Sequence, residues 1–291
     1  MIWHQGTHSR NSDKAKPTST HQPIGVFDSG VGGLTVLTEL QRVLPNESIL
    51  YFGDTANLPY GTKTPSEILH CVRAILDWMV SCDAKMVIMA CNTSSALALE
   101  IVRAEYDIPI LGVILPAARA AVQLGERIGV IATPATAQSH AYRSAIQEAS
   151  PRTSVWEVGC PEFVPLIEHG RVHEPETRAI VQRYLHGLIE KQIDTLVYGC
   201  THYPYLSTVI CDLLPPVVNL VNPAVHVVQA AKQEFGLIGG GQGIFSNASQ
   251  PTTQFFVSDR PQRFQELAAT LLNYVPDVHQ CNLLPSAPLM G

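Results

Sequence analysis

Charged residues are scarce in this chain of 291 residues, at 15% against 46% hydrophobic residues, and the formal net charge is −6. The lysines and arginines form no cluster, which argues against a nucleic-acid-binding surface. No apolar stretch approaches the roughly 18–20 residues that a membrane-spanning helix requires, so no membrane partner is expected. The hydrophobic share is still enough for one large or two medium globular domains with real cores.

The seven cysteines include no C-x-x-C pair, which argues against a zinc knuckle and against a thioredoxin-type site. Their odd number and irregular spacing are typical of reduced thiols, and they favour a cytoplasmic protein. Residues 1–22 are polar and lack the apolar core of a secretory signal, so this segment is predicted to be a flexible N-terminal extension. A loop is predicted around Gly236 and the glycines at 239–241, because no strand and helix flank them as a phosphate cradle requires.

Short apolar runs alternate with longer helix-like stretches along the chain. Several of these runs are continuous Val and Ile, as expected for strands that are buried on both faces. The alternation predicts an α/β fold with mainly parallel sheets. Strands are expected at 24–27, 48–52, 86–89, 108–114, 128–131, 154–158, 195–198, 217–221 and 254–257, and helices at 34–43, 66–80, 96–106, 117–124, 137–149, 175–191 and 205–214.

Two cysteines lie in closely similar sequence frames. Cys91 lies in KMVIMACNTSS (85–95) and Cys200 in DTLVYGCTHYP (194–204), so each follows an apolar run and precedes a helix-like stretch. The similarity predicts two related α/β domains with the active site in the cleft between them. Prolines at Leu115-Pro116 and Asn222-Pro223 suggest the crossover points. The predicted domains are residues 23–115 plus 224–291, carrying Cys91, and residues 116–223, carrying Cys200.

The position of each cysteine suggests acid/base chemistry. Ligands of open parallel sheets bind at the carboxyl ends of the strands, where both thiols are expected. Asn92, Thr93 and Ser94 are suitable helix caps, and a helix N-terminus would lower the thiol pKa. An isolated cysteine after an apolar run is usually only a small buried hydrophobe, and the other five cysteines are interpreted in that way.

Two further segments are candidates for the same edge. GVFDSGVGGL (25–34) places Asp28 and Ser29 at the end of the first strand, but its glycine spacing is not the dinucleotide fingerprint. YFGDTANLPYGTK (51–63) forms a polar loop after the second strand. Such a loop is ordinarily a turn, although loops at strand ends often carry function.

These segments together resemble glutamate racemase, of the aspartate/glutamate racemase superfamily. IATPAT (131–136) and CPEFVPLIE (160–168) match the same family, and the resemblance covers about residues 23 to 260. It implies cofactor-independent interconversion of L- and D-glutamate, which supplies D-glutamate for peptidoglycan and the cell wall. It also implies a homo-oligomer, expected to be a dimer.

The resemblance assigns roles residue by residue. It implies that Cys91 acts on D-glutamate with the assistance of Asp28, and that Cys200 acts on L-glutamate with the assistance of His202. Glu168 corresponds to an acidic residue near the second cysteine. The positions that correspond to substrate-binding residues are Asp28, Ser29, Tyr60, Gly61, Asn92, Thr93, Thr201 and His202.

Chemistry supports the assignment, because inverting a stereocentre through a carbanion needs a base on one face and an acid on the other. Without an electron-sink cofactor, positioning and electrostatics must stabilise the carbanion. His169 and His173 are the best-spaced metal-ligand pair, but no third ligand is apparent, so no metal is expected. An aspartate racemase-like enzyme and a non-catalytic amino-acid-binding protein are the alternatives.

Overall fold

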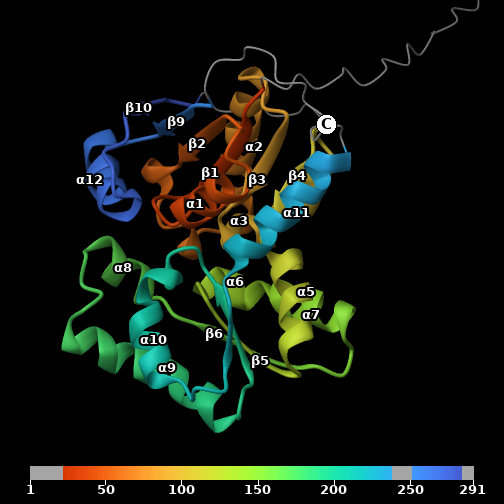
Figure 1. Cartoon of the computed structure of the whole chain (residues 1–291), viewed down its shortest axis with the longest axis vertical. Coiled ribbons are helices and arrows are strands. Elements are labelled where there is room, and N and C mark those ends of the chain that lie inside the picture. The colour runs from red at the N-terminus through yellow and green to blue at the C-terminus, as the bar shows by residue number, and fades with distance from the viewer. Residues whose placement is uncertain (1–21, 238–250, 284–291) are drawn as a thin grey trace, which may run out of the picture.

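The computed structural model describes residues 22–237 and 251–283. The chain forms two parallel sheets that lie one above the other (Figure 1). The first sheet has the order β10-β9-β2-β1-β3-β4 and the second has the order β6-β5-β7-β8. The strands of the first sheet are β1 (Ile24–Asp28), β2 (Ile49–Gly53), β3 (Met86–Met89), β4 (Ile110–Gly112), β9 (Thr253–Val257) and β10 (Val278–Gln280). Those of the second are β5 (Arg127–Ala132), β6 (Ser154–Gly159), β7 (Thr195–Gly199) and β8 (Asn219–Val221).

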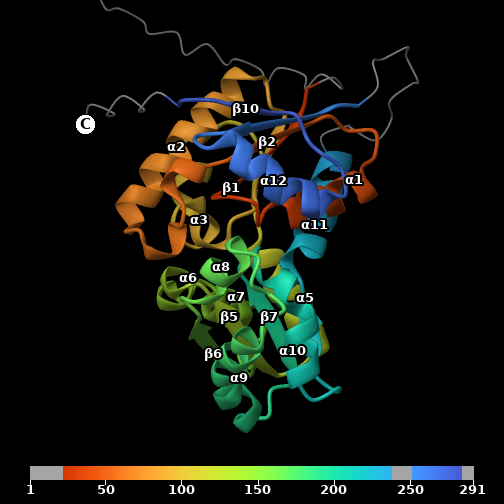
Figure 2. The same cartoon turned by 90° about the vertical axis from the view of Figure 1, so that its left-hand side faces the viewer.

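Helices cover both sheets, as the predicted α/β fold requires (Figure 2). Up to residue 149 the helices are α1 (Leu34–Val43), η1 (Thr55–Asn57), η2 (Tyr60–Thr62), α2 (Pro65–Ser81), α3 (Asn92–Leu97), α4 (Leu99–Arg103), α5 (Ile114–Leu124), α6 (Pro134–Ser139) and α7 (Ala141–Ala149). They continue with α8 (Phe163–Glu168), α9 (Pro175–Glu190), η3 (Tyr203–Leu206), α10 (Ser207–Leu213), α11 (Pro223–Leu237) and α12 (Pro261–Leu272). No helix in these described ranges has the length and apolar character needed to cross a membrane.

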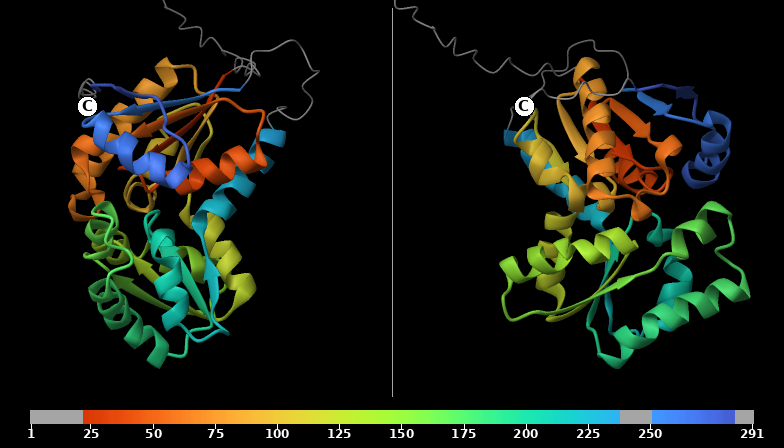
Figure 3. Two further views of the ribbon diagram at one scale, coloured as in Figure 1. Left: turned by 60° about the vertical axis from the view of Figure 1, so that its left-hand side comes forward. Right: turned by 180° about the vertical axis from the view of Figure 1, so that it is seen from behind.

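Each sheet and the helices on it form one half of the molecule, and one hydrophobic core runs through both halves. It joins residues of β1 and α1 to residues of β5, α5 and α7, with α11 packed against both α1 and α5 (Figure 3). Separate cores lie under α2 on the first sheet and under α9 on the second. The two sheets are therefore held together by the shared core around α5 and α11, where the chain crosses between them.

The expected strand at 108–114 is shorter than predicted, because β4 ends at Gly112 and α5 begins at Ile114. Leu115 and Pro116, expected as the crossover, lie in the first turn of α5. A proline is tolerated there because the first helical N–H groups have no partner within the helix. The second predicted crossover lies at the β8–α11 junction, where the Ala224 N–H donates to Asn222 Oδ1 at 3.1 Å. The domain limits themselves stay a prediction.

Two expected helices are interrupted. The helix predicted at 137–149 divides at His140, whose φ of 55° lies in the left-handed region. The helix predicted at 96–106 divides at Ala98 into α3 and α4. The predicted N-terminal extension lies outside the described residues except for Gln22, and the glycines at 239–241 lie outside them entirely. Gly236 lies inside α11 rather than in a loop.

Candidate active site

Cys91 lies at the carboxyl end of β3, where it is the N-cap residue of α3. The predicted caps at 92–94 are instead the first residues of that helix. Burial, and after it the charge of Asp28, raise the pKa of the Cys91 thiol to about 12, although the backbone N–H groups of Ser94 and Thr93 oppose the rise. The expected lowering of the pKa is therefore wrong for Cys91, because desolvation outweighs the helix N-terminus.

Cys200 occupies the corresponding position after β7, on the second sheet. Its Sγ lies 3.9 Å from His202 Nδ1, and His202 Nε2 lies 2.7 Å from Glu168 Oε1. Burial alone would lower the pKa of His202, but the contacts with Cys200 and Glu168 outweigh it and raise the pKa well above 6.5. His202 is therefore held as an imidazolium beside Cys200.

Asp28 ends β1 and is fully buried. One carboxylate oxygen accepts a hydrogen bond from the Gly30 N–H at 2.9 Å, and the other accepts from Thr201 Oγ1 at 3.0 Å. Burial raises the pKa of Asp28, although the charge of His202 and these hydrogen bonds oppose the rise. Asp28 is thus a stronger base than an exposed aspartate, and its bond to Thr201 links the two halves.

The glycine turn after Asp28 is required by close packing between the halves. A Cβ at Gly32 would lie 2.4 Å from both His202 Nδ1 and Thr201 Oγ1. A Cβ at Gly33 would lie 2.5 Å from the Asp28 Cβ. Only glycine lets the backbone pass this close to the two side chains.

Both thiols line one pocket with about 650 Å³ of empty space, open solvent at its mouth included. The wall comes from both halves of the chain. It includes the predicted residues Ser29, Tyr60, Gly61, Asn92, Thr93, Thr201 and His202. Asp28 and Glu168 do not line the pocket, and they contact residues that do.

Asn92 offers the pocket a free donor. Its Oδ1 accepts a hydrogen bond from the Tyr142 hydroxyl at 2.6 Å, whereas its buried Nδ2 has no partner among the described residues. A buried donor of this kind is costly unless a ligand accepts from it. The Tyr60 hydroxyl, in contrast, donates to Asp54 Oδ2 at 2.6 Å, so Tyr60 faces the pocket with other atoms.

Sequence reasoning missed several residues of the pocket wall. Thr133 joins Thr93 and Thr136 in a cluster of hydroxyl groups 2.9–3.1 Å apart, which again links the halves. Cys160, interpreted as an ordinary buried cysteine, also lines the pocket and donates its thiol to the Val158 carbonyl. The remaining missed residues are Leu58, Pro59, Thr62, Pro134, Pro161, Val164 and Pro165. Most lie within the segments that matched the family, which was the available signal.

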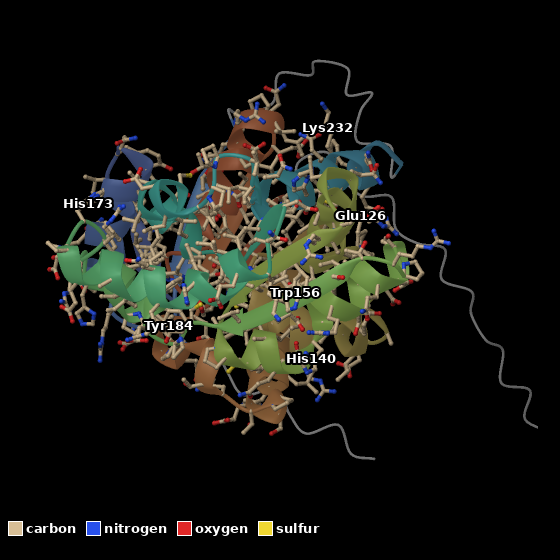
Figure 4. All side chains as sticks on the ribbon, turned by 90° about the horizontal axis from the view of Figure 1, so that it is seen from below. Glu126, His140, Trp156, His173, Tyr184 and Lys232 are labelled. Carbon is tan, nitrogen blue, oxygen red and sulfur yellow. The ribbon has the colours of Figure 1, made fainter. Side chains whose placement is uncertain are left out.

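The histidine pair considered for a metal does not join a larger set of ligands. The described residues contain no group of three or more His, Cys, Asp or Glu side chains able to hold a metal ion. His173 lies at the periphery of the molecule, at the edge of the view from below (Figure 4).

Fold and site together define a class: a two-domain α/β protein that presents one buried thiol from each parallel sheet to a common pocket. Residues 24–231 match the family model described as Asp/Glu/Hydantoin racemase. A glutamate racemase of Trichormus variabilis is 61% identical over 255 residues, which cover 87% of this chain and 86% of that protein. The chain belongs to the Asp/Glu/Hydantoin racemase family and is an enzyme of the racemase class.

Solved structures agree with this assignment. A glutamate racemase isoform from Bacillus anthracis matches with a TM-score of 0.86 and 33% identity, covering 92% of this chain and all (100%) of that one. The glutamate racemase of Francisella tularensis, solved in complex with D-glutamate, matches with a TM-score of 0.82 and 34% identity, covering 90% and 97% of the two chains. The predicted two-domain α/β fold with parallel sheets is confirmed.

Proposed function

We propose that this chain interconverts L- and D-glutamate without a cofactor, by proton transfer between Cys91 and Cys200. The observation that carries the proposal is that one thiol reaches the pocket from each sheet, each with its own acid/base partner nearby. The named activity of the relatives supplies the substrate. The two domains would be residues 23–115 plus 224–291 and residues 116–223, with one cysteine in each.

The two thiols have unequal surroundings. Burial keeps Cys91 a thiol, whereas Cys200 lies beside the ring of His202. In the direction from L-glutamate, Cys200 is the base. Cys200 takes the α-proton, which breaks the C–H bond and forms S–H, and Cys91 returns its own proton to the opposite face of the carbanion.

The reverse reaction requires Cys91 as the base. Asp28 accepts the Cys91 proton in this direction, and its raised pKa makes it a suitable acceptor. His202 then acts with Cys200 as the proton donor, and Glu168 keeps the ring oriented. The Asn92 amide and the hydroxyls of Ser29, Thr93 and Thr201 bind the substrate and stabilise the charge of the carbanion.

The first experiment is incubation with L-glutamate in D₂O, with a chelator and without pyridoxal phosphate. Loss of optical activity together with deuterium at the α-carbon is the expected result. Turnover of L-aspartate alone would instead favour an aspartate racemase. Glutamate binding without α-hydrogen exchange would favour a non-catalytic amino-acid-binding protein.

Removing either thiol tests the two-base assignment. Cys91→Ala and Cys200→Ala should each lower racemisation by about 10²- to 10⁴-fold, the usual contribution of a general acid or base. Cys211→Ala on the exposed face of α10 is the matched control and should keep full activity. Near-normal turnover in either pocket variant, with an unchanged circular dichroism spectrum, would contradict the mechanism.

We further propose that the enzyme is a cytoplasmic homodimer whose D-glutamate enters peptidoglycan. The family relationship supports the metabolic role, and reduced cysteines fit the compartment. Sedimentation equilibrium would give the oligomeric state. Depletion of the enzyme in growing cells, with and without added D-glutamate, would test the role in the cell wall.

A further inference from the structure

Helix α12 packs on the first sheet but contacts Glu168, which hydrogen-bonds to His202 beside Cys200 in the other half. Arg263 of this helix donates a hydrogen bond from Nη2 to the backbone carbonyl of Glu168, at 2.9 Å. Glu168 is the last residue of α8, in the other half of the molecule. In both views α12 lies above α8, on the side of the first sheet (Figures 1 and 2). One helix thus bridges the gap between the halves beside the site.

The contact fills a defined position at the end of α8. The last carbonyls of a helix have no partner within it and must find one outside. Backbone N–H groups of residues 169–171 occupy the carbonyls of Pro165, Leu166 and Ile167, and Arg263 occupies that of Glu168. A cation at a helix C-terminus is also electrostatically favourable.

Glu168 is held on several sides at once. Its carboxylate binds His202 at 2.7 Å, and a Cβ on Gly30 would lie 3.5 Å from Oε1. Its carbonyl accepts from Arg263. Arg263 thus contacts the backbone of the residue whose carboxylate meets the His202 ring beside Cys200.

The helix that carries Arg263 is anchored by a buried aromatic residue. The next residue, Phe264, is 2% exposed, and its ring lies 5.9 Å from that of Tyr51. The Tyr51 hydroxyl donates to the Gly30 carbonyl at 2.7 Å. Helix α12 thus packs on Tyr51, which is hydrogen-bonded to the turn that follows Asp28.

We propose that Arg263 is a positioning residue for the acid/base couple at Cys200, acting by clamping the end of α8 so that Glu168 orients His202. The proposal rests on the proposed function, since it needs Cys200 to exchange the α-proton of L-glutamate. It means that a hydrogen bond between the two halves, outside the pocket, influences the rate of racemisation.

The test variant is Arg263→Met, which keeps the apolar stem and removes the donors. Arg260→Met removes the same charge at the start of the same helix, where the side chain is 79% exposed and pairs with Asp259. Arg263→Lys keeps a cationic donor. His202→Asn serves as the direct lesion of the same couple.

The decisive measurement is the deuterium isotope effect on kcat/KM with L-[2-²H]glutamate and with D-[2-²H]glutamate. We expect Arg263→Met to lower kcat/KM about three- to tenfold, the effect of one hydrogen bond of ordinary net strength. The loss is equal in both directions, because the equilibrium constant of a racemase is one. A slower step at Cys200 raises the isotope effect from L-glutamate and lowers it from D-glutamate.

His202→Asn should change the two isotope effects in the same directions as Arg263→Met does, up from L-glutamate and down from D-glutamate. Arg263→Lys should recover part of the rate, and Arg260→Met should have the rate and isotope effects of wild type. Unchanged isotope effects in Arg263→Met, with or without a loss of rate, would overturn the positioning role and leave the proposed function intact. Absence of glutamate racemisation in the wild-type enzyme would overturn both.

Discussion

At the residue scale, the two thiols follow similar sequence but lie in different electrostatic surroundings. The matching frames predicted that both cysteines would follow buried strands, and both do. The frames did not reveal that burial and the charge of Asp28 raise the pKa of Cys91, or that Glu168 approaches the ring of His202. These effects come from residues far away in the chain, which local sequence does not identify.

The raised pKa of Cys91 predicts a loss of stability at alkaline pH. The thiol has a pKa of about 12 in the folded protein against an ordinary 9.0, so above pH 9 the unfolded chain loses its proton first. Stability from this group is complete below pH 9 and is lost as the pH rises towards 12. We expect the unfolding free energy of wild type to fall about 1 kcal/mol more than that of Cys91→Ala between pH 8 and 10.

Urea denaturation of both proteins at the two pH values measures this difference, with Cys211→Ala as the control for a cysteine at an exposed position. Parallel losses in wild type and Cys91→Ala would show that the thiol titrates at its ordinary pKa.

At the element scale, several helices were predicted well, whereas α8, α11 and α12 were not predicted. Helices α1, α2 and α9 lie close to their expected ranges. Helix α8 was missed because it has six residues, including Pro165, and shows no helical period. The break at His140 was missed because its left-handed backbone leaves the pattern of apolar residues uninterrupted.

The glycine turn between β1 and α1 gives the prediction at this scale. Gly32→Ala would place a Cβ 2.4 Å from two buried side chains, so either the turn or the His202 ring must move. We expect a loss of about 1–3 kcal/mol in stability, as for overpacking elsewhere, together with at least a tenfold loss of kcat, on the order of what misplaced catalytic groups cost.

Gly187→Ala in α9 is the matched control, because a Cβ there meets no atom within 4 Å. It should gain up to about 1 kcal/mol from helix propensity and keep full activity. Thermal denaturation and racemisation rates of the two variants measure both effects, and equal behaviour would show that the turn tolerates a side chain.

At the scale of the whole molecule, the buried Lys85 connects α11 to the first sheet. Lys85, 2% exposed at the start of β3, pairs with Glu47 and lies with its Nζ 4.5 Å from the centre of the Phe235 ring of α11. The chain crosses between the halves at α5 and at α11, so this contact stabilises the connection between them.

Removing the lysine should be strongly destabilising. Lys85→Met leaves Glu47 without its cation, and we expect a loss of about 3–5 kcal/mol, whereas Lys85→Met combined with Glu47→Gln should recover much of it. Arg73→Met, which breaks the more exposed pair with Glu105, should cost about 1 kcal/mol or less. Urea denaturation of wild type and the three variants measures the free energies of unfolding. Equal losses for Lys85→Met and Arg73→Met would contradict the expectation that the more buried pair contributes more.

The sequence by itself determined the α/β alternation, the parallel sheets and the family, because strand and helix periods and short motifs are local properties of the chain. It also identified half of the residues that line the pocket, both thiols included. Only the tertiary structure decided that burial raises the pKa of Cys91, that the His202 ring is held as a cation, and how α12 reaches α8. Those outcomes depend on desolvation and on contacts between residues as far apart as Glu168 and Arg263, which form only when both halves close around the pocket.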